Sequence, residues 1–205
     1  MRGTHPTRYH GPGAIRRVRT THRFICMIEY RVARSVRILF VGINPHPGSY
    51  RRGVPFSNNK TFWYLLNRAG LLNEDENVLR TDRGLKEMYD KRFLPKYRLG
   101  FINLVERPTR EVTELKRGEE KAGVERAIQV ILTYKPKVVC FVGKVTYNKF
   151  RGTRDCDYGW QENIGASRVY VMHFPIRGPA AIRLQELEEL KQASEEGSSL
   201  LADNG

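Results

Sequence analysis

Cysteine is scarce in this chain of 205 residues, and long apolar runs are absent. The three cysteines form no CxxC pair and do not stand beside a histidine at metal-ligand spacing. An iron–sulfur cluster or a tetrathiolate zinc site needs four thiolates, so three cysteines cannot build either one. We therefore expect no metal, no cofactor and no disulfide framework, which suits a reducing compartment.

The longest apolar run near the N-terminus covers only residues 24–28. This run is too short for the hydrophobic region of a signal peptide or for a membrane span. We therefore expect no membrane association. The expected location is the cytoplasm, at the nucleoid, in a prokaryote and the nucleus in a eukaryote.

Acidic residues are too few to balance the basic ones. The chain has 36 Lys and Arg against 22 Asp and Glu, a net charge of +14. From Gln185 onward six acids face one lysine, so this end carries −5 and residues 1–184 carry +19. A body this basic favours a polyanionic partner, most often nucleic acid. The alternative is an arginine-rich surface that is engaged in ion pairs.

Composition divides the chain into three parts. Residues 1–23 mix Gly, Pro, Arg, His and Thr without periodicity and predict a flexible basic arm. Residues 24–193 have the length and apolar content of one domain with a substantial core. Residues 194–205 are polar and acidic and predict a disordered tail.

Short apolar runs define the expected fold. Runs without polar alternation predict strands that are buried on both faces, and they cover residues 38–41, 99–105, 138–142 and 168–173. Apolar periodicity and capping residues predict helices over residues 61–66, with Asn58 or Asn59 as N-cap, and over 82–93, 118–134, 145–150 and 180–191. Residues 44–53 and 151–165 are expected to be loops. This alternation predicts an α/β fold, a three-layer sandwich with a central, mainly parallel four-stranded sheet flanked by helices.

Glycine and polar residues stand at the carboxyl ends of all four expected strands. They are Gly42, Asn103, Gly143 and His173. The carboxyl ends of parallel strands meet at one edge of a sheet, where open α/β proteins bind their ligands. The sequence therefore predicts a site at this edge. The alternative is structural: Asn103 would cap a turn, and His173 would be a buried structural histidine.

Several motifs along the chain resemble one family. Gly42-Ile43-Asn44-Pro45 is followed by Phe56, twelve residues after Asn44, and by the pair Phe62-Trp63. Residues 100–109 read GFINLVERPT, and Gly143-Lys144 precedes Tyr147. Together these motifs resemble the uracil-DNA glycosylase superfamily, and within it the mismatch-specific uracil/thymine branch, over residues 36–192.

This resemblance implies a monofunctional DNA glycosylase that acts as a monomer on double-stranded DNA. Such an enzyme hydrolyses the N-glycosidic bond of a flipped uracil, or of a mismatched thymine in a G·T pair, and leaves an abasic site. It implies that Asn44 orients the attacking water and that His173 stabilises the departing base. It also places the base against Ile43, His46, Phe56 and Asn103, with Phe56 as the stacking platform and Asn103 as the reader of the uracil edge.

The resemblance also implies which residues contact the duplex. Arg51 and Arg52 are the expected phosphate ligands. The loop after the last expected strand contains Ile176, Arg177, Gly178 and Pro179, and Ile176, Arg177 or Pro179 would fill the gap that the flipped base leaves. The chain departs from the branch at His46, where the branch usually has Gly and strict uracil enzymes have Tyr.

Two other functions remain open at the sequence level. The first is a glycosylase of the same fold that removes another deaminated base, such as hypoxanthine. The second is a DNA-binding module without catalysis, against which the presence of Asn44, Phe56 and Asn103 argues. Incubation with duplexes that contain uracil, thymine or hypoxanthine separates these functions.

Overall fold

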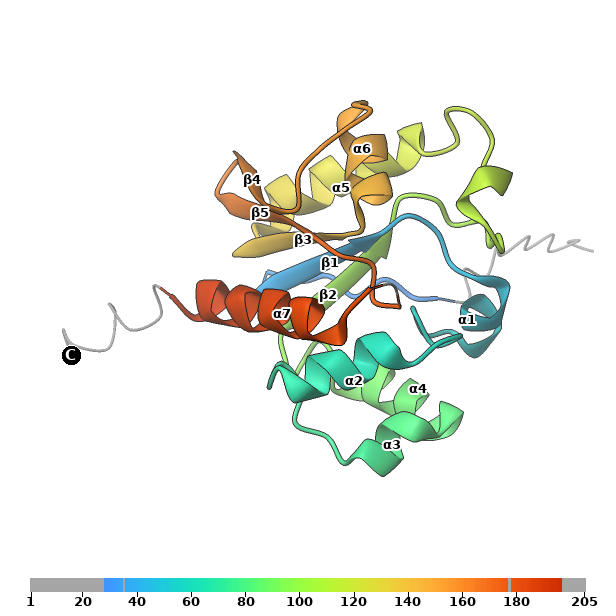
Figure 1. The fold of residues 1–205 in the computed structure, drawn as a ribbon, viewed down its shortest axis with the longest axis vertical. Coiled ribbons are helices and arrows are strands. Elements are labelled where there is room, and N and C mark those ends of the chain that lie inside the picture. Colours follow the sequence, from blue (N-terminus) through green and yellow to red (C-terminus); the bar gives the residue numbers. More distant parts are fainter. Residues whose placement is uncertain (1–27, 35, 177, 197–205) are drawn as a thin grey trace, which may run out of the picture.

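The computed structural model describes residues 28–34, 36–176 and 178–196 (Figure 1). The expected N-terminal arm, the candidate wedge residue Arg177 and residues 197–205 of the expected tail lie outside the described residues. The boundaries between arm, domain and tail therefore stay predictions.

A five-stranded sheet of order β2-β1-β3-β5-β4 forms the centre of the molecule. Its strands are β1 (Ile38–Gly42), β2 (Leu99–Asn103), β3 (Val138–Val142), β4 (Gly159–Ile164) and β5 (Ser167–Met172). The strands β2, β1, β3 and β5 run parallel, and β4 runs antiparallel to β5. The predicted α/β fold with a mainly parallel sheet is confirmed.

The fifth strand was not predicted. β4 lies within residues 151–165, which the sequence presented as a loop, and all of its residues are half-buried or exposed. An edge strand with this burial has no continuous apolar run, which was the signal for the other four. It is held by the perpendicular packing of Trp160 on Tyr170, whose ring centroids are 4.9 Å apart.

Seven α-helices accompany the sheet within the described residues. They are α1 (Pro47–Arg52), α2 (Thr61–Arg68), α3 (Glu76–Arg80), α4 (Asp82–Lys91), α5 (Lys121–Tyr134), α6 (Lys144–Arg151) and α7 (Ala180–Glu195), with a 3-10 turn η1 (Val112–Glu114). Every predicted helix is present, although α4 ends two residues early and α5 begins three residues late. Neither α1 nor α3 was predicted, because helices of six and five residues are too short to show apolar periodicity.

Two helix ends differ in detail from the prediction. Lys60 occupies the N-cap position of α2, while Asn59 Oδ1 accepts the Thr61 N–H at 3.0 Å. At the other end of the chain α7 continues to Glu195, so Ser194 and Glu195 are helical rather than part of a tail. Among the described residues no helix is long and apolar enough to cross a membrane.

Alternate residues of each strand face opposite layers of helices. Figure 1 shows α2, α3, α4 and α7 on one side of the sheet and α5 and α6 on the other. Phe40, Phe101 and Met172 pack toward the first layer, whereas Leu39, Phe141 and Val171 pack toward the second. The three-layer arrangement is therefore confirmed.

The strand order sets the position of the ligand crevice. The chain passes from β1 to its neighbour β2 on one side, and from β3 toward β5 on the other. The loops that leave β1 and β3 therefore diverge at the carboxyl edge, and this divergence makes a topological switch point, where open α/β sheets bind ligands.

Candidate active site

Asn103 and Gly42 lie next to each other at the carboxyl ends of β2 and β1, where they are register partners. Asn103 shares a strand face with Leu99 and Phe101, because every second residue of a strand points the same way. A Cβ atom on Gly42 would lie 2.5 Å from Oδ1 of Asn103. The missing side chain of Gly42 thus leaves the space that the Asn103 amide occupies.

The main-chain carbonyl of Asn103 accepts two hydrogen bonds, whereas its side-chain amide has no partner in the described part of the chain. The Asn103 carbonyl oxygen accepts hydrogen bonds from Arg126 Nη2 at 3.0 Å and from the Tyr30 hydroxyl at 3.3 Å. The side-chain amide makes no hydrogen bond with any residue in the described part of the chain, although Asn103 is only 3% exposed. Neither amide atom is among the fully buried side-chain polar atoms that lack a partner, so the amide still reaches solvent and its donor and acceptor are both available to a ligand.

Asn44 follows β1 and is oriented by Thr109. Its Nδ2 donates to Thr109 Oγ1 at 2.8 Å and to the Pro45 carbonyl at 3.2 Å. The Thr109 hydroxyl donates its own proton to the Glu111 carbonyl at 2.8 Å, so it can only accept from Asn44. Asn44 Oδ1 accepts no hydrogen bond within the described ranges. The amide therefore presents an acceptor, which is the group needed to hold a water proton.

Phe56 lies under strain at the edge of an aromatic cluster. Its φ is +53°, a value that bulky residues rarely adopt. The neighbouring Trp63 Nε1 donates to the Pro55 carbonyl at 2.8 Å, which holds this turn in place. The half-buried ring of Phe56 has its centroid 4.6 Å from Phe62, 5.6 Å from Phe101 and 6.3 Å from Phe174.

His46 and Ile43 belong to the turn between β1 and α1. His46 is the N-cap of α1, and its Nδ1 accepts the Gly48 N–H at 3.1 Å. This contact fixes the half-buried ring and places the proton of the neutral imidazole on Nε2. The Ile43 carbonyl accepts the Val105 N–H at 2.7 Å and ties this turn to the segment after β2.

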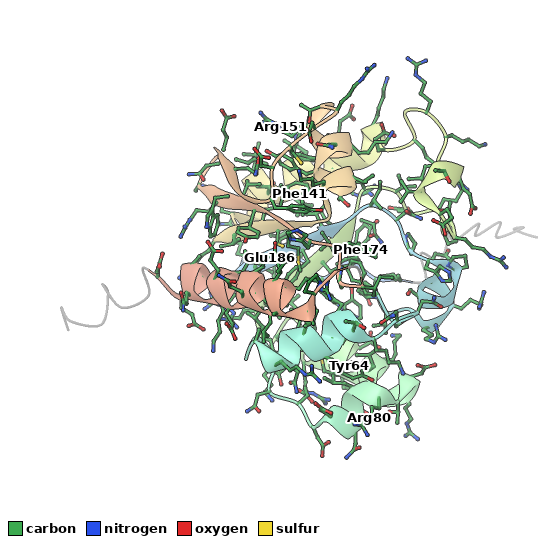
Figure 2. All side chains as sticks on the ribbon, in the orientation of Figure 1. Tyr64, Arg80, Phe141, Arg151, Phe174 and Glu186 are labelled. Carbon is green, nitrogen blue, oxygen red and sulfur yellow. The ribbon has the colours of Figure 1, made fainter. Side chains whose placement is uncertain are left out.

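His173 is the first residue beyond β5. Its Nδ1 lies 2.7 Å from Oε1 of Glu186, and its main-chain N–H donates to the same carboxylate at 3.0 Å. The Tyr158 ring stacks on the imidazole at a centroid distance of 3.5 Å. Figure 2 labels Glu186 on α7 and Phe174 on the loop that joins β5 to α7. The expected convergence of Gly42, Asn103, Gly143 and His173 on one edge is what the parallel register produces.

The two candidate phosphate ligands on α1 differ. Arg51 is exposed and has no ion-pair partner in the described part of the chain. Arg52 Nε instead donates to Asp82 at 2.8 Å, and Asp82 also pairs with Lys60. Hydrogen bonds from Lys60 and Arg52 hold the pKa of Asp82 below its usual value. Arg52 therefore joins α1 to α4, and only Arg51 faces solvent without a partner.

The loop between β5 and α7 contains the candidate wedge. Ile176 is 49% exposed, Gly178 adopts φ +75°, and Pro179 occupies the N-cap position of α7. The Gly178 carbonyl accepts a hydrogen bond from Nη1 of the buried Arg183 at 2.8 Å, which anchors the end of this loop. An exposed isoleucine beside an anchored turn has the character of an intercalating side chain.

Sequence reasoning missed four supporting residues. Thr109, Arg126, Tyr158 and Glu186 hold the candidate site residues, yet none was assigned a role. Thr109 lies in the GFINLVERPT segment and could have been suspected, whereas no spacing pattern links Glu186 to His173. Cys140 is fully buried as expected, and burial raises the pKa of its thiol far above the usual value, so it is unreactive. No group of three or more His, Cys, Asp or Glu side chains among the described residues could hold a metal ion.

Fold and site together define a class of protein. It is a doubly wound α/β domain whose switch point carries the Asn103 amide, the aromatic ring of Phe56 and the Asn44 side-chain oxygen, which accepts no hydrogen bond from the described residues. The family model of the Uracil DNA glycosylase superfamily matches residues 30–194, well over half of the chain. The chain belongs to this superfamily, and it is therefore a DNA glycosylase, a hydrolase that acts on DNA in base excision repair.

Proposed function

We propose that this glycosylase removes uracil that is flipped out of double-stranded DNA, with a preference for G·U mismatches, and leaves an abasic site. The observation that supports this proposal is the side-chain amide of Asn103, which has no hydrogen-bond partner among the described residues although the residue is only 3% exposed. Its NH2 group can donate to O4 of uracil, while its oxygen can accept the N3–H. A neutral amide is the side-chain group that matches both positions at once.

Phe56 supplies the stacking surface for the extruded base. Flipping costs a few kcal/mol, least at a mismatch, and stacking on an aromatic ring recovers about 1–3 kcal/mol per base. Because Phe62 and Phe101 support the ring from the protein side, the platform does not need to form when DNA binds. The strained φ of this residue is consistent with a side chain that is held in place for a ligand.

Asn44 orients the water that attacks the sugar carbon. With its NH2 group engaged by Thr109 and Pro45, its oxygen is the acceptor for this water. An amide cannot take up the proton as a carboxylate would. The reaction therefore depends on stabilisation of the departing base, to which His173 contributes a hydrogen bond from the edge of β5.

The duplex lies against the carboxyl edge of the sheet. Arg51 contacts a phosphate, and Ile176 fills the space of the flipped base. The +19 charge of residues 1–184 draws DNA to this body.

The direct test is base release from matched duplexes. The protein, in molar excess, is incubated with duplexes that contain G·U, A·U, G·T or a hypoxanthine·T pair, and abasic sites are then cleaved with alkali. We expect efficient release from G·U. Release of hypoxanthine without release of uracil would assign the scaffold to another deaminated base, and no release from any duplex would contradict the proposal.

Asn103→Asp tests the role of the amide in the same assay. A carboxylate offers no donor to O4 and places a negative charge beside the departing anion, so we expect uracil release to fall at least 100-fold, by about 3 kcal/mol. Asn148→Ala is the control, because Asn148 lies on α6 and its amide donates to the Arg154 carbonyl in the loop after this helix. Equal rates for Asn103→Asp and wild type would return Asn103 to a structural role.

A further inference from the structure

The Glu186 carboxylate is buried, and among the described residues it has a single partner. Glu186 is 6% exposed and faces the end of β5 from α7. Both of its hydrogen-bonding contacts go to one residue, to Nδ1 and the main-chain N–H of His173. Within the described ranges, His173 is also its only ion-pair partner. A carboxylate removed from water in this way needs a hydrogen-bonded positive partner.

This contact determines which ring nitrogen of His173 carries a proton. An ionised carboxylate only accepts hydrogen bonds, so Nδ1 must be the protonated nitrogen. Nε2 has no partner among the described residues, and 32% of the His173 side chain is exposed. The stacked Tyr158 ring covers one face of the imidazole and prevents it from rotating freely. Nε2 is therefore the atom that His173 presents to a ligand.

Four charged or titratable groups lie around this pair, two toward the sheet and two on the other side. Tyr170 on β5 and Cys140 on β3 lie on the sheet side, and burial raises the pKa of both, so both are neutral. On the solvent side Lys144 Nζ lies 4.8 Å from the centre of the Tyr158 ring. Arg183, one turn earlier on α7, donates to the Gly178 carbonyl. The Glu186 carboxylate is thus the charged group in direct contact with the imidazole, and an imidazolium at this position has a donor on both ring nitrogens.

We propose that Glu186 is a positioning residue that directs Nδ1–H of His173 inward and supports an imidazolium whose Nε2–H donates to an anionic oxygen of the bound DNA. This proposal rests on the proposed function. The oxygen belongs either to the departing pyrimidine or to a phosphate beside the flipped nucleotide, and both offer the same hydrogen-bond chemistry. His173 stands two strand spacings from β1, about 9.6 Å, on the opposite side of the switch point from Asn103.

The first test does not depend on activity. Nitrogen-15 NMR on the free protein, at a pH where the imidazole is neutral, reports which ring nitrogen of His173 is protonated. We expect the proton on Nδ1 in the wild type. In Glu186→Ala the proton should move largely to Nε2, the form that histidine prefers without a partner. A wild-type ring protonated on Nε2 would overturn the proposal.

The second test is a double-mutant cycle measured by single-turnover base release. We expect Glu186→Ala and His173→Ala each to slow release by at least about tenfold. If Glu186 acts only through His173, the double variant will be no slower than His173→Ala. A Glu186→Ala penalty of the same size in both backgrounds would show a structural role and overturn the proposal.

Two further variants make the cycle specific. Glu186→Gln keeps an oxygen to accept Nδ1–H but removes the charge, so it should retain the tautomer and lose rate. Glu189→Ala removes a carboxylate one turn along α7 that bonds to Tyr170 and Trp160, and we expect its rate to stay within twofold of wild type. Thermal melts of all variants show whether a rate loss follows from unfolding.

Binding to a duplex with a tetrahydrofuran abasic analogue separates the two sources of the oxygen. Weaker binding by both Glu186→Ala and His173→Ala would assign a phosphate, and unchanged binding with slower release would assign the pyrimidine. A Glu186→Ala variant with neither change would overturn the proposal. If the wild type releases no base at all, the proposed function fails, while the NMR and binding measurements still test Glu186.

Discussion

Gly42 and Asn103 are register partners on β1 and β2, and a Cβ on Gly42 would stand 2.5 Å from the Asn103 side-chain oxygen. The Phe101 ring closes the same space at 3.3 Å. Gly42 is therefore required because the Asn103 side chain occupies the space of a Cβ atom, and not because of its own backbone angles. The consequence is a direct link between the first motif of the chain and the residue proposed to recognise the base.

Gly42→Ala should displace the Asn103 amide and impair base recognition. Overpacking of this kind costs about 1–3 kcal/mol when the surroundings must shift, so we expect uracil release to fall roughly 10- to 100-fold. Affinity for an abasic-analogue duplex should be retained, because the phosphate contacts lie elsewhere. Release at the wild-type rate would mean that Asn103 can move without loss and does not bind the base.

Thr109→Val should slow base release although Thr109 touches no substrate. The substitution removes the hydroxyl that holds Asn44 Nδ2 at 2.8 Å and leaves the amide free to rotate. We expect a loss of about 10- to 100-fold, smaller than that of Asn44→Ala, which should abolish most release while duplex binding stays within a few fold.

Thr146→Val is the matched control for Thr109→Val. Thr146 lies on α6 and is also buried, and its hydroxyl donates to the Val142 carbonyl at the end of β3. The Thr146→Val variant should be less stable than wild type, without a comparable decrease in the single-turnover rate of base release. If both threonine variants slow single-turnover base release by the same factor, the effect comes from stability and the orientation of Asn44 is not involved.

His46 should discriminate against the thymine methyl. Its ring is held as the N-cap of α1 and lies between Pro45 and Pro47, so it cannot yield easily. A pocket rejects one extra methyl by about 1–3 kcal/mol, so we expect G·T to be processed at least roughly tenfold more slowly than G·U.

Two substitutions separate the proposed discrimination against thymine from the N-cap role of His46. His46→Gly should lower the ratio of the G·U rate to the G·T rate. His46→Asn keeps a good N-cap acceptor on a smaller side chain, and it should narrow the ratio while preserving thermal stability. A ratio that neither variant changes, or thymine release as fast as uracil release in the wild type, would remove His46 from substrate selection.

Arg51 and Arg52 should differ in their effect on DNA binding. Arg51→Ala should weaken binding to undamaged duplex and lower the slope of log affinity against log salt by about one. Arg52→Ala breaks the half-exposed pair with Asp82, so it should cost at most about 1 kcal/mol of stability, with a smaller effect on the slope. Fluorescence anisotropy over a range of salt concentrations measures both, and equal slopes for the two variants would contradict this assignment.

Local sequence was sufficient for most of the sheet and for the candidate site edge. β3 was predicted with its observed bounds, and the other parallel strands within two residues, because a strand that is covered on both faces must be continuously apolar. The edge strand β4 and the short helix α1 lack such a signal. β4 is half-buried at best, and α1 depends on a histidine cap and on Gly53 at φ +65°.

The sequence by itself determined which residues stand at the ends of the parallel strands, since apolar runs and the glycine, asparagine or histidine at their ends are local features. Only the tertiary structure decided which side chains support them. Asn44 meets Thr109 from 65 positions away, His173 meets Glu186 from 13, and Arg52 meets Asp82 from 30. Such contacts depend on how helices pack against the sheet, so no spacing in the chain encodes them.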